Sequence, residues 1–333
     1  MVLLSVIIPT RNRPKLLADA LRSILTQSLD HNLYEILVIN NGSDEDTRQM
    51  ISTLNKTYAN RIQYLRADEP GLHVGRHLGA RHAKGEILTF TDDDIIAQPE
   101  WLKAVIESFQ DNDIALVGGK NLPEWEAEPP EWTNLFKKRN EYGWFLGYLS
   151  LLDFSNNFKE IPARFVFGCN FSIRKTILYE CGGFHPDGMP KELIQYRGDG
   201  ETALSEAIEK KGYRTAYNPR ASIYHRVPAK RLQIDYFCQR AFNQGISDSY
   251  TEIRANRGLS VPVAKKKTLL RSFPKYILRR LTSFLSDRNE PRRKVPPARA
   301  QVNEAYHKGK VFHRKKVSNN PELLNFILKK NYF

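Results

Sequence analysis

Two short apolar runs near the start of the chain, residues 4–9 and 34–39, each lead directly into a polar segment. Between them, apolar residues recur at helical spacing over 16–25, behind an Arg13-Pro14 pair that suits the first turn of a helix. Strand, helix and strand in this order form a βαβ unit, in which both strands are parallel and end at the same edge of the sheet. The pattern predicts a doubly wound α/β sheet with its chemistry at that edge.

The same alternation continues along the chain. Helices are expected at 46–58, 99–109 and 202–212, and strands at 62–65, 86–90, 165–167, 171–173, 214–217 and 222–224. The stretch 122–162 is rich in Pro, Trp and Gly, and we predict loops and short helices over a cleft there.

The formal charge of +14 is concentrated at one end of the chain. Residues 254–333 hold 21 Lys or Arg against 4 Asp or Glu, whereas residues 1–253 hold 30 against 33. Within this tail, 262–316 are expected to form a basic helix followed by an extended linker, with apolar residues at helical spacing over 269–285. Such a segment suits an anionic membrane surface through residues 265–316, or packing against the body of the protein or a second subunit.

The cysteine content and the apolar runs indicate the cellular compartment in which the protein is expected. Three cysteines in 333 residues form neither a disulfide framework nor a CxxC metal motif, which favours a reducing compartment. The nearly uncharged run 142–152 is too short to span a bilayer, and 2–8 lacks the basic leader of a signal peptide. We expect a cytoplasmic protein, peripheral on the inner face of the membrane if the basic tail binds lipid.

Three consecutive aspartates, Asp92, Asp93 and Asp94, directly follow the strand expected at 86–90. Carboxylates this close repel one another unless a cation compensates them. A divalent ion that prefers oxygen ligands, Mg²⁺ or Mn²⁺, would do so and would leave coordination positions for phosphate oxygens. The alternative is a solvated loop whose aspartates cap the helix expected at 99–109.

Together these segments resemble glycosyltransferase family 2, whose members have the GT-A fold. The resemblance covers about 3–228 and rests on the ordered segments Ser5–Arg13, Glu35–Ser43, Gly71–Glu86, Phe90–Asp94, Gly168–Ser172, Cys181–Phe184, Gly198–Thr202 and Asn218–His225. It implies a GT-A domain over 1–228, with a donor nucleotide-binding half at 1–100 and an acceptor half at 101–228. Residues 229–333 would form a basic, mainly helical extension.

The resemblance implies an inverting transfer of a sugar from a nucleotide-diphosphate sugar to an acceptor hydroxyl. By the family pattern Asp94 binds the metal, and Asp92 and Asp93 line the ribose and phosphates. Arg76 neutralises phosphate or contacts the base, and Pro9, Thr10 and Arg11 form the floor under the base. His225 ends a strand where a relative's histidine can complete the metal shell, which would favour Mn²⁺, although a lone histidine is often structural.

The general base is expected in the segment Asp199-Gly200-Glu201. Register with the family places Glu201 at the base position, with Asp199 as its neighbour. Either carboxylate could serve, and both could instead stabilise the amino end of the following helix.

Two departures from the family pattern concern the donor side. Asn40 stands where the family often has an aspartate. UDP-, dTDP- and GDP-sugars therefore all stay possible as donors, and UDP is favoured because it is usual in the family. Asp44 could supply the missing carboxylate. His77 stands where asparagine is common, and its role stays open.

Acceptors consistent with this reading are sugars or lipid-linked sugars in polysaccharide, cell-surface glycan or glycolipid synthesis. A sugar-nucleotide nucleotidyltransferase is the alternative enzyme, but its glycine-rich, lysine-ended phosphate loop is missing after the first strand. A nucleic-acid-binding protein using the basic tail is the non-enzymatic alternative. It leaves the aspartates unexplained, so no nucleic-acid partner is expected.

Overall fold

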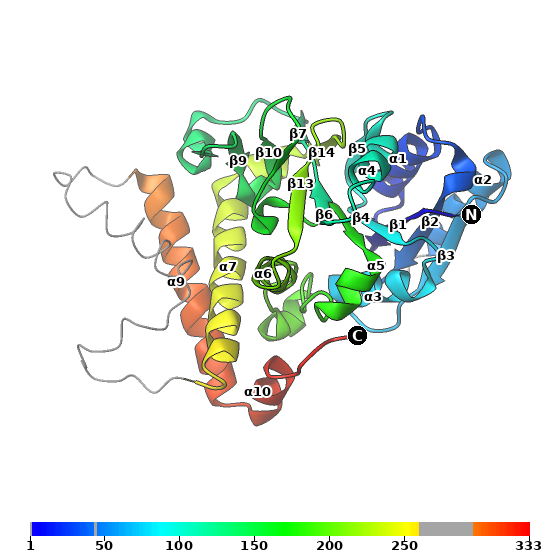
Figure 1. The fold of residues 1–333 in the computed structure, drawn as a ribbon. Helices are drawn as coiled ribbons and strands as arrows, with labels where there is room; N and C mark the ends of the chain where they lie inside the picture. The colour runs from blue at the N-terminus through cyan, green and yellow to red at the C-terminus, as the bar shows by residue number, and fades with distance from the viewer. Residues whose placement is uncertain (1, 43–44, 260–295) are drawn as a thin grey trace.

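The computed structural model describes residues 2–42, 45–259 and 296–333 (Figure 1). Its main sheet has eight strands in the order β11-β13-β6-β12-β4-β1-β2-β3. Their bounds are β1 Leu4–Thr10, β2 Tyr34–Asn40, β3 Ile62–Arg66, β4 Ile87–Thr91, β6 Ile114–Gly118, β11 Lys159–Glu160, β12 Asn170–Arg174 and β13 Arg214–Tyr217. β12 runs antiparallel to β4 and β6, so the sheet is mixed.

Helices cover both faces of this sheet because alternate strand residues point to opposite sides. In β1, Val6 and Ile8 belong to one buried cluster and Ile7 to another. The first cluster includes residues of α1 Pro14–Leu25, α2 Glu45–Thr57 and α4 Trp101–Ser108. The second includes residues of α3 Leu72–His82, α5 Lys175–Glu180 and α6 Thr202–Lys210. The predicted doubly wound α/β fold is confirmed.

A second sheet corrects the expectation for 122–162. This sheet has the order β5-β14-β7-β10-β9-β8, with bounds β5 Ile95–Ala97, β7 Asn121–Trp125, β8 Lys138–Arg139, β9 Trp144–Leu146, β10 Leu151–Asp153 and β14 Ile223–Val227. Four of its strands come from the stretch expected to be loops and short helices. β7 finds its parallel partner in β14, about a hundred residues later, and such long-range pairing leaves little local signal. The strand expected at 165–167 is also wrong, because 163–165 form a short 3-10 helix.

Three helices follow the sheets: α7 Ile234–Ala255, α9 Pro297–Ser318 and α10 Pro321–Ile327. α7 and α9 lie side by side (Figure 1) and are closely packed, since a Cβ on Gly309 would lie 2.0 Å from the Phe242 carbonyl oxygen. An extended linker is therefore wrong for 297–316. Pro297 is instead the first residue of α9. The buried side chains of this helix, including Val302 and Val317, pack against the rest of the protein. The part of the basic-helix prediction on 262–295 lies outside the described residues.

Among the described residues, no helix combines the length and the apolar content needed to cross a membrane.

Candidate functional site

Three polar segments predicted to meet at one edge of the main sheet do so. β1 and β2 are paired in register so that Thr10 lies beside Asn40, and β4 lies on the other side of β1. The Thr10 hydroxyl donates a 2.7 Å hydrogen bond to Asp93, which joins the ends of β1 and β4. β14, in the second sheet, adds His225, whose backbone pairs with Ile95 just after the aspartates.

Asp92, Asp94 and His225 form a cluster that fits a divalent metal ion. One ligand atom from each residue lies within 4.8 Å of the others, and Asp94 and His225 are both buried. His225 Nδ1 lies 2.9 Å from the Leu149 carbonyl oxygen, which can only accept, so Nδ1 carries a proton. Its Nε2 lies 3.3 Å from Asp94 Oδ1: when protonated it donates to that carboxylate, and when deprotonated it offers its lone pair to a metal ion. Carboxylate oxygens and an imidazole nitrogen are ligands that divalent metal ions accept.

The three aspartates differ in their protonation. Burial raises the pKa of Asp92, and the charge of Asp94 adds to this effect. Burial also raises the pKa of Asp93, to about 6, against the opposing charge of Arg13. Burial alone would raise the pKa of Asp94, but its contacts with His225, Arg231 and Arg13 bring it well below the ordinary value. Asp94 is thus the carboxylate most firmly held as an anion.

The predicted floor and donor residues have different surroundings. Pro9 and Thr10 are buried at the end of β1, whereas Arg11 is exposed. Asn40 is buried: it donates to the Tyr64 hydroxyl at 3.0 Å and accepts from the Gly42 N–H at 2.8 Å. Both ends of its amide are therefore engaged within the protein. Asp44 lies outside the described residues.

Arg76, on α3, lies between two carboxylates of the site. Its Nη2 is 3.8 Å from Asp92 and its Nη1 is 3.7 Å from Glu201, while the guanidinium packs over the Phe184 ring. Although only 2% of the residue is exposed, its Nε has no hydrogen-bond partner in the part of the chain that the structure describes. A buried guanidinium with spare donors suits a phosphate group.

The two candidate bases have opposite environments. The Asp199 side chain is only 5% exposed and both of its oxygens are engaged: one lies 2.7 Å from His185 Nδ1, and the other accepts from the Thr251 hydroxyl at 2.7 Å. Glu201 immediately precedes α6 but its side chain makes no capping hydrogen bond to it. Its carboxylate accepts from the Gly168 N–H at 3.3 Å and its side chain is 29% exposed. Glu201 is therefore the more accessible of the two carboxylates.

Two arginines of the site were not predicted. Arg13 Nη1 lies 3.0 Å from Asp93 and 3.5 Å from Asp94, and Arg231 Nη2 lies 2.6 Å from Asp94. From its sequence context, Arg13 is expected only at the start of a helix. Arg231 stands six residues after His225 without a recognisable motif, so only the spacing from His225 could have drawn attention to it.

His77 has a structural environment. Its Nδ1 donates to the Tyr332 carbonyl at 3.0 Å, its Nε2 accepts from the Phe184 N–H at 2.9 Å, and its ring stacks on Phe333. Burial, reinforced by nearby His73, lowers the pKa of His77 to about 3. The neutral imidazole therefore joins α3 to the residues at 332–333.

This burial predicts acid sensitivity. The unfolded chain protonates His77 near its ordinary pKa of 6.5, whereas the folded chain does so only near 3, so stability present above pH 6.5 is lost as the pH falls. Between pH 7.5 and 5.5 the loss for this group is about 1 kcal/mol. Urea unfolding at both pH values should show that His77→Asn loses less stability on acidification than the wild type. The exposed His31→Asn should behave like the wild type; equal losses in all three proteins would contradict the assignment.

Comparisons with known proteins find glycosyltransferases that are similar to this chain. Over 271 residues the chain is 24% identical to a glucosyl-dolichyl phosphate glucuronosyltransferase of Haloferax volcanii, which covers 81% of this chain and 82% of that protein. It is 28% identical over 204 residues to validoxylamine A glucosyltransferase of Streptomyces hygroscopicus subsp. limoneus, 56% of this chain but only 44% of that protein.

A solved structure shows the same fold. The mannosyltransferase PcManGT from Pyrobaculum calidifontis, in complex with GDP-Man and Mn²⁺, aligns with a TM-score of 0.56 and 17% identity, over 94% of this chain and 86% of that one. The profile of Glycosyl transferase family 2 matches residues 5–182, more than half of the chain. Because the match covers this much of the chain and the fold agrees, the chain belongs to glycosyl transferase family 2 and is a glycosyltransferase with a GT-A fold.

Proposed function

We propose that the protein transfers a sugar from a nucleotide-diphosphate sugar to an acceptor hydroxyl with inversion at the anomeric carbon. One observation carries the proposal: Arg76 places a buried positive charge between Asp92 of the metal cluster and the partly exposed Glu201. A site for a leaving diphosphate and a site for an attacking hydroxyl are thereby adjacent.

Each residue has a role in this proposal. Asp92, Asp94 and His225 would hold the divalent ion, which supplies positive charge to the departing diphosphate. Glu201 takes the proton of the acceptor hydroxyl as that oxygen attacks, with its carboxylate oriented by the Gly168 N–H. Arg76 stabilises the phosphate charge in a buried setting, where it acts more strongly than in water.

Asp199 supports the base without acting as one. Its carboxylate fixes His185 and Thr251, and the turn that it begins presents Glu201. Asp93 has a similar supporting role, since its carboxylate accepts hydrogen bonds from the Thr10 hydroxyl and the Arg13 guanidinium.

We propose Mn²⁺ as the preferred ion and leave the nucleotide to experiment. His225 favours Mn²⁺ over Mg²⁺ because imidazole is a poor ligand for Mg²⁺. The solved structure with the same fold contains GDP-Man, whereas UDP-sugars are common donors in the family. Asn40 is uncharged, so it does not select between these two bases by charge.

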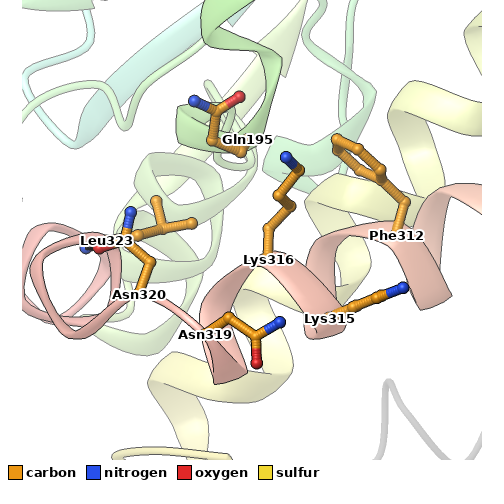
Figure 2. A pocket seen from close by; sticks show the side chains of 7 residues that line it. All are labelled: Gln195, Phe312, Lys315, Lys316, Asn319, Asn320 and Leu323. Carbon is orange, nitrogen blue, oxygen red and sulfur yellow. Dashed lines mark hydrogen bonds between the residues drawn. The ribbon is translucent and has the colours of Figure 1, made fainter.

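We further propose a lipid-linked acceptor and a membrane-facing surface on α9 and α10. A pocket of about 480 Å³ lies where α9 meets α10. It is lined by Lys315, Lys316, Gln195, Phe312, Asn319, Asn320 and Leu323. Figure 2 shows the Lys316 side chain reaching toward Gln195 beside Phe312. Neither lysine pairs with a carboxylate among the described residues, and Val311 on the same helix is 66% exposed. Exposed lysines beside an exposed apolar residue suit an anionic bilayer surface.

Vesicle binding tests this surface. Because each basic residue near an anionic bilayer contributes about 1 kcal/mol, Lys315→Glu with Lys316→Glu should weaken binding to phosphatidylglycerol vesicles by about tenfold or more. The control, Lys84→Glu with Lys103→Glu, makes the same charge change on exposed lysines elsewhere. Equal vesicle binding by the two double variants would contradict a membrane-facing role for the surface on α9 and α10.

The activity itself is tested by turnover. The full chain is incubated with UDP-, GDP- and dTDP-sugars and Mn²⁺, with simple glycosides and polyprenyl-phosphate sugars as acceptors. Release of nucleoside diphosphate together with a glycoside of inverted anomeric configuration is expected. Pyrophosphate release from a nucleoside triphosphate and a sugar 1-phosphate would instead establish a nucleotidyltransferase.

A further inference from the structure

Arg231 contacts two of the three residues in the metal cluster. Its Nη2 lies 2.6 Å from Asp94 Oδ2, and its Nη1 lies 3.4 Å from Nε2 of His225. The arginine belongs to the short 3-10 helix Ala229–Leu232, which joins β14 to α7. Its side chain is 14% exposed and that of Asp94 is 5% exposed, so water screens this ion pair weakly.

The same atoms are the ones that a metal ion would use. Because Nδ1 of His225 donates to a backbone carbonyl, Nε2 is the nitrogen available to a metal, and it faces the guanidinium. Asp94 likewise has one oxygen on Arg231 and the other facing His225. A divalent ion and the guanidinium cannot both take these positions without one giving way.

Charge leads to the same conclusion. Three arginines lie against the three aspartates: Arg76 near Asp92, Arg13 on Asp93, and Arg231 on Asp94. These three arginines balance the three aspartates, and Glu201, which also faces Arg76, adds one negative charge. A divalent ion therefore brings more positive charge than the remaining carboxylate can balance, unless one arginine moves or an anion arrives with the ion. Arg231 alone makes the direct contact with both Asp94 and His225 among these three arginines.

We propose that Arg231 is an internal counter-cation that competes with the divalent ion for Asp94 and His225. Metal binding displaces its guanidinium, and the Tyr236 ring, 5.8 Å away, offers the displaced cation an aromatic face. The competition makes the site bind a free metal ion weakly. This inference rests on the proposed metal site and adds a residue that tunes its affinity.

Binding of Mn²⁺ alone, without nucleotide, tests the competition. Free Mn²⁺ is measured by electron paramagnetic resonance during titration of the full chain. Arg231→Gln removes the competing charge and should bind Mn²⁺ at least about tenfold more tightly than the wild type, since a charge-assisted hydrogen bond to Asp94 no longer has to be broken. Arg231→Lys keeps a cation and should lie between the two.

The matched control is Arg226→Gln. Arg226 adjoins His225 in β14, yet its guanidinium pairs with Asp19 and Glu124 and not with the metal cluster. This variant should bind Mn²⁺ as the wild type does.

A thermal readout covers the case in which Arg231→Gln is less stable. Without metal this variant should melt below the wild type, and saturating Mn²⁺ should raise its melting temperature by more than it raises that of the wild type. Equal or weaker Mn²⁺ binding by Arg231→Gln, with binding still abolished by Asp94→Asn, would overturn the competition while leaving the metal site intact. Absence of Mn²⁺ binding in every variant would instead overturn the metal site, and the inference with it.

Discussion

Replacing Asp94 with asparagine should reduce sugar transfer by about 10³-fold or more, because a metal ion contributes several kcal/mol of transition-state stabilisation and Asp94 is its most firmly ionised ligand. The loss should appear in Mn²⁺-dependent turnover of the donor that the wild type uses. Raising the Mn²⁺ concentration should restore little of it, since the asparagine oxygen is a neutral ligand.

A matched replacement separates this effect from a general loss of charge. Asp113 is exposed and pairs with Arg214 at the surface, so Asp113→Asn should keep full activity. Folding of both variants is checked by their melting temperatures. Mn²⁺-dependent transfer that survives in Asp94→Asn would contradict the metal assignment.

Replacing Glu201 with glutamine should reduce the transfer rate by about 10²- to 10⁴-fold, the usual contribution of a general base, while donor binding stays unchanged. The amide keeps the shape of the side chain and can still accept from the Gly168 N–H, but it cannot take a proton. Single-turnover rates and donor affinity, measured separately, check the two halves of this expectation.

Asp199→Asn provides the contrast. It removes the charge that holds His185 and Thr251, so stability should fall by about 1–3 kcal/mol while a larger share of activity remains. The reverse pattern, an active Glu201→Gln and a stable but inactive Asp199→Asn, would move the base to Asp199.

The parts of the fold that the sequence predicts are those with strong local signals. The strands at 4–10, 34–40 and 87–91 are short and mainly apolar. The polar residues after them had to meet because parallel strands end at the same edge of a sheet. The acidic triplet could be recognised for the same reason, since three like charges at such an edge require compensation.

The second sheet and α9 lack such signals. β7, β9 and β10 are short, and their pairing is decided by β14 and by one another rather than by their own composition. α9 begins after a proline-rich stretch that suits a linker, but its helix is stabilised by close packing on α7, where Gly245 and Gly309 let the backbones approach. Neither partner of such a contact is visible from local sequence.

The same limit applies to the site. The sequence identifies Asp199 and Glu201 as candidate bases. It does not show that Asp199 is held by His185 and Thr251, whereas Glu201 stays accessible. Arg231 was missed because it reaches Asp94 from a turn 137 positions away, and no motif connects the two.

Nucleotide binding with and without the metal tests the central claim most directly. The full chain is titrated calorimetrically with UDP, GDP and dTDP, in Mn²⁺ and again in EDTA. At least one diphosphate should bind in Mn²⁺ and bind at least about tenfold more weakly in EDTA, and Asp94→Asn should bind equally weakly in both conditions. Tight binding that is the same in EDTA, or that Asp94→Asn retains, would contradict the account.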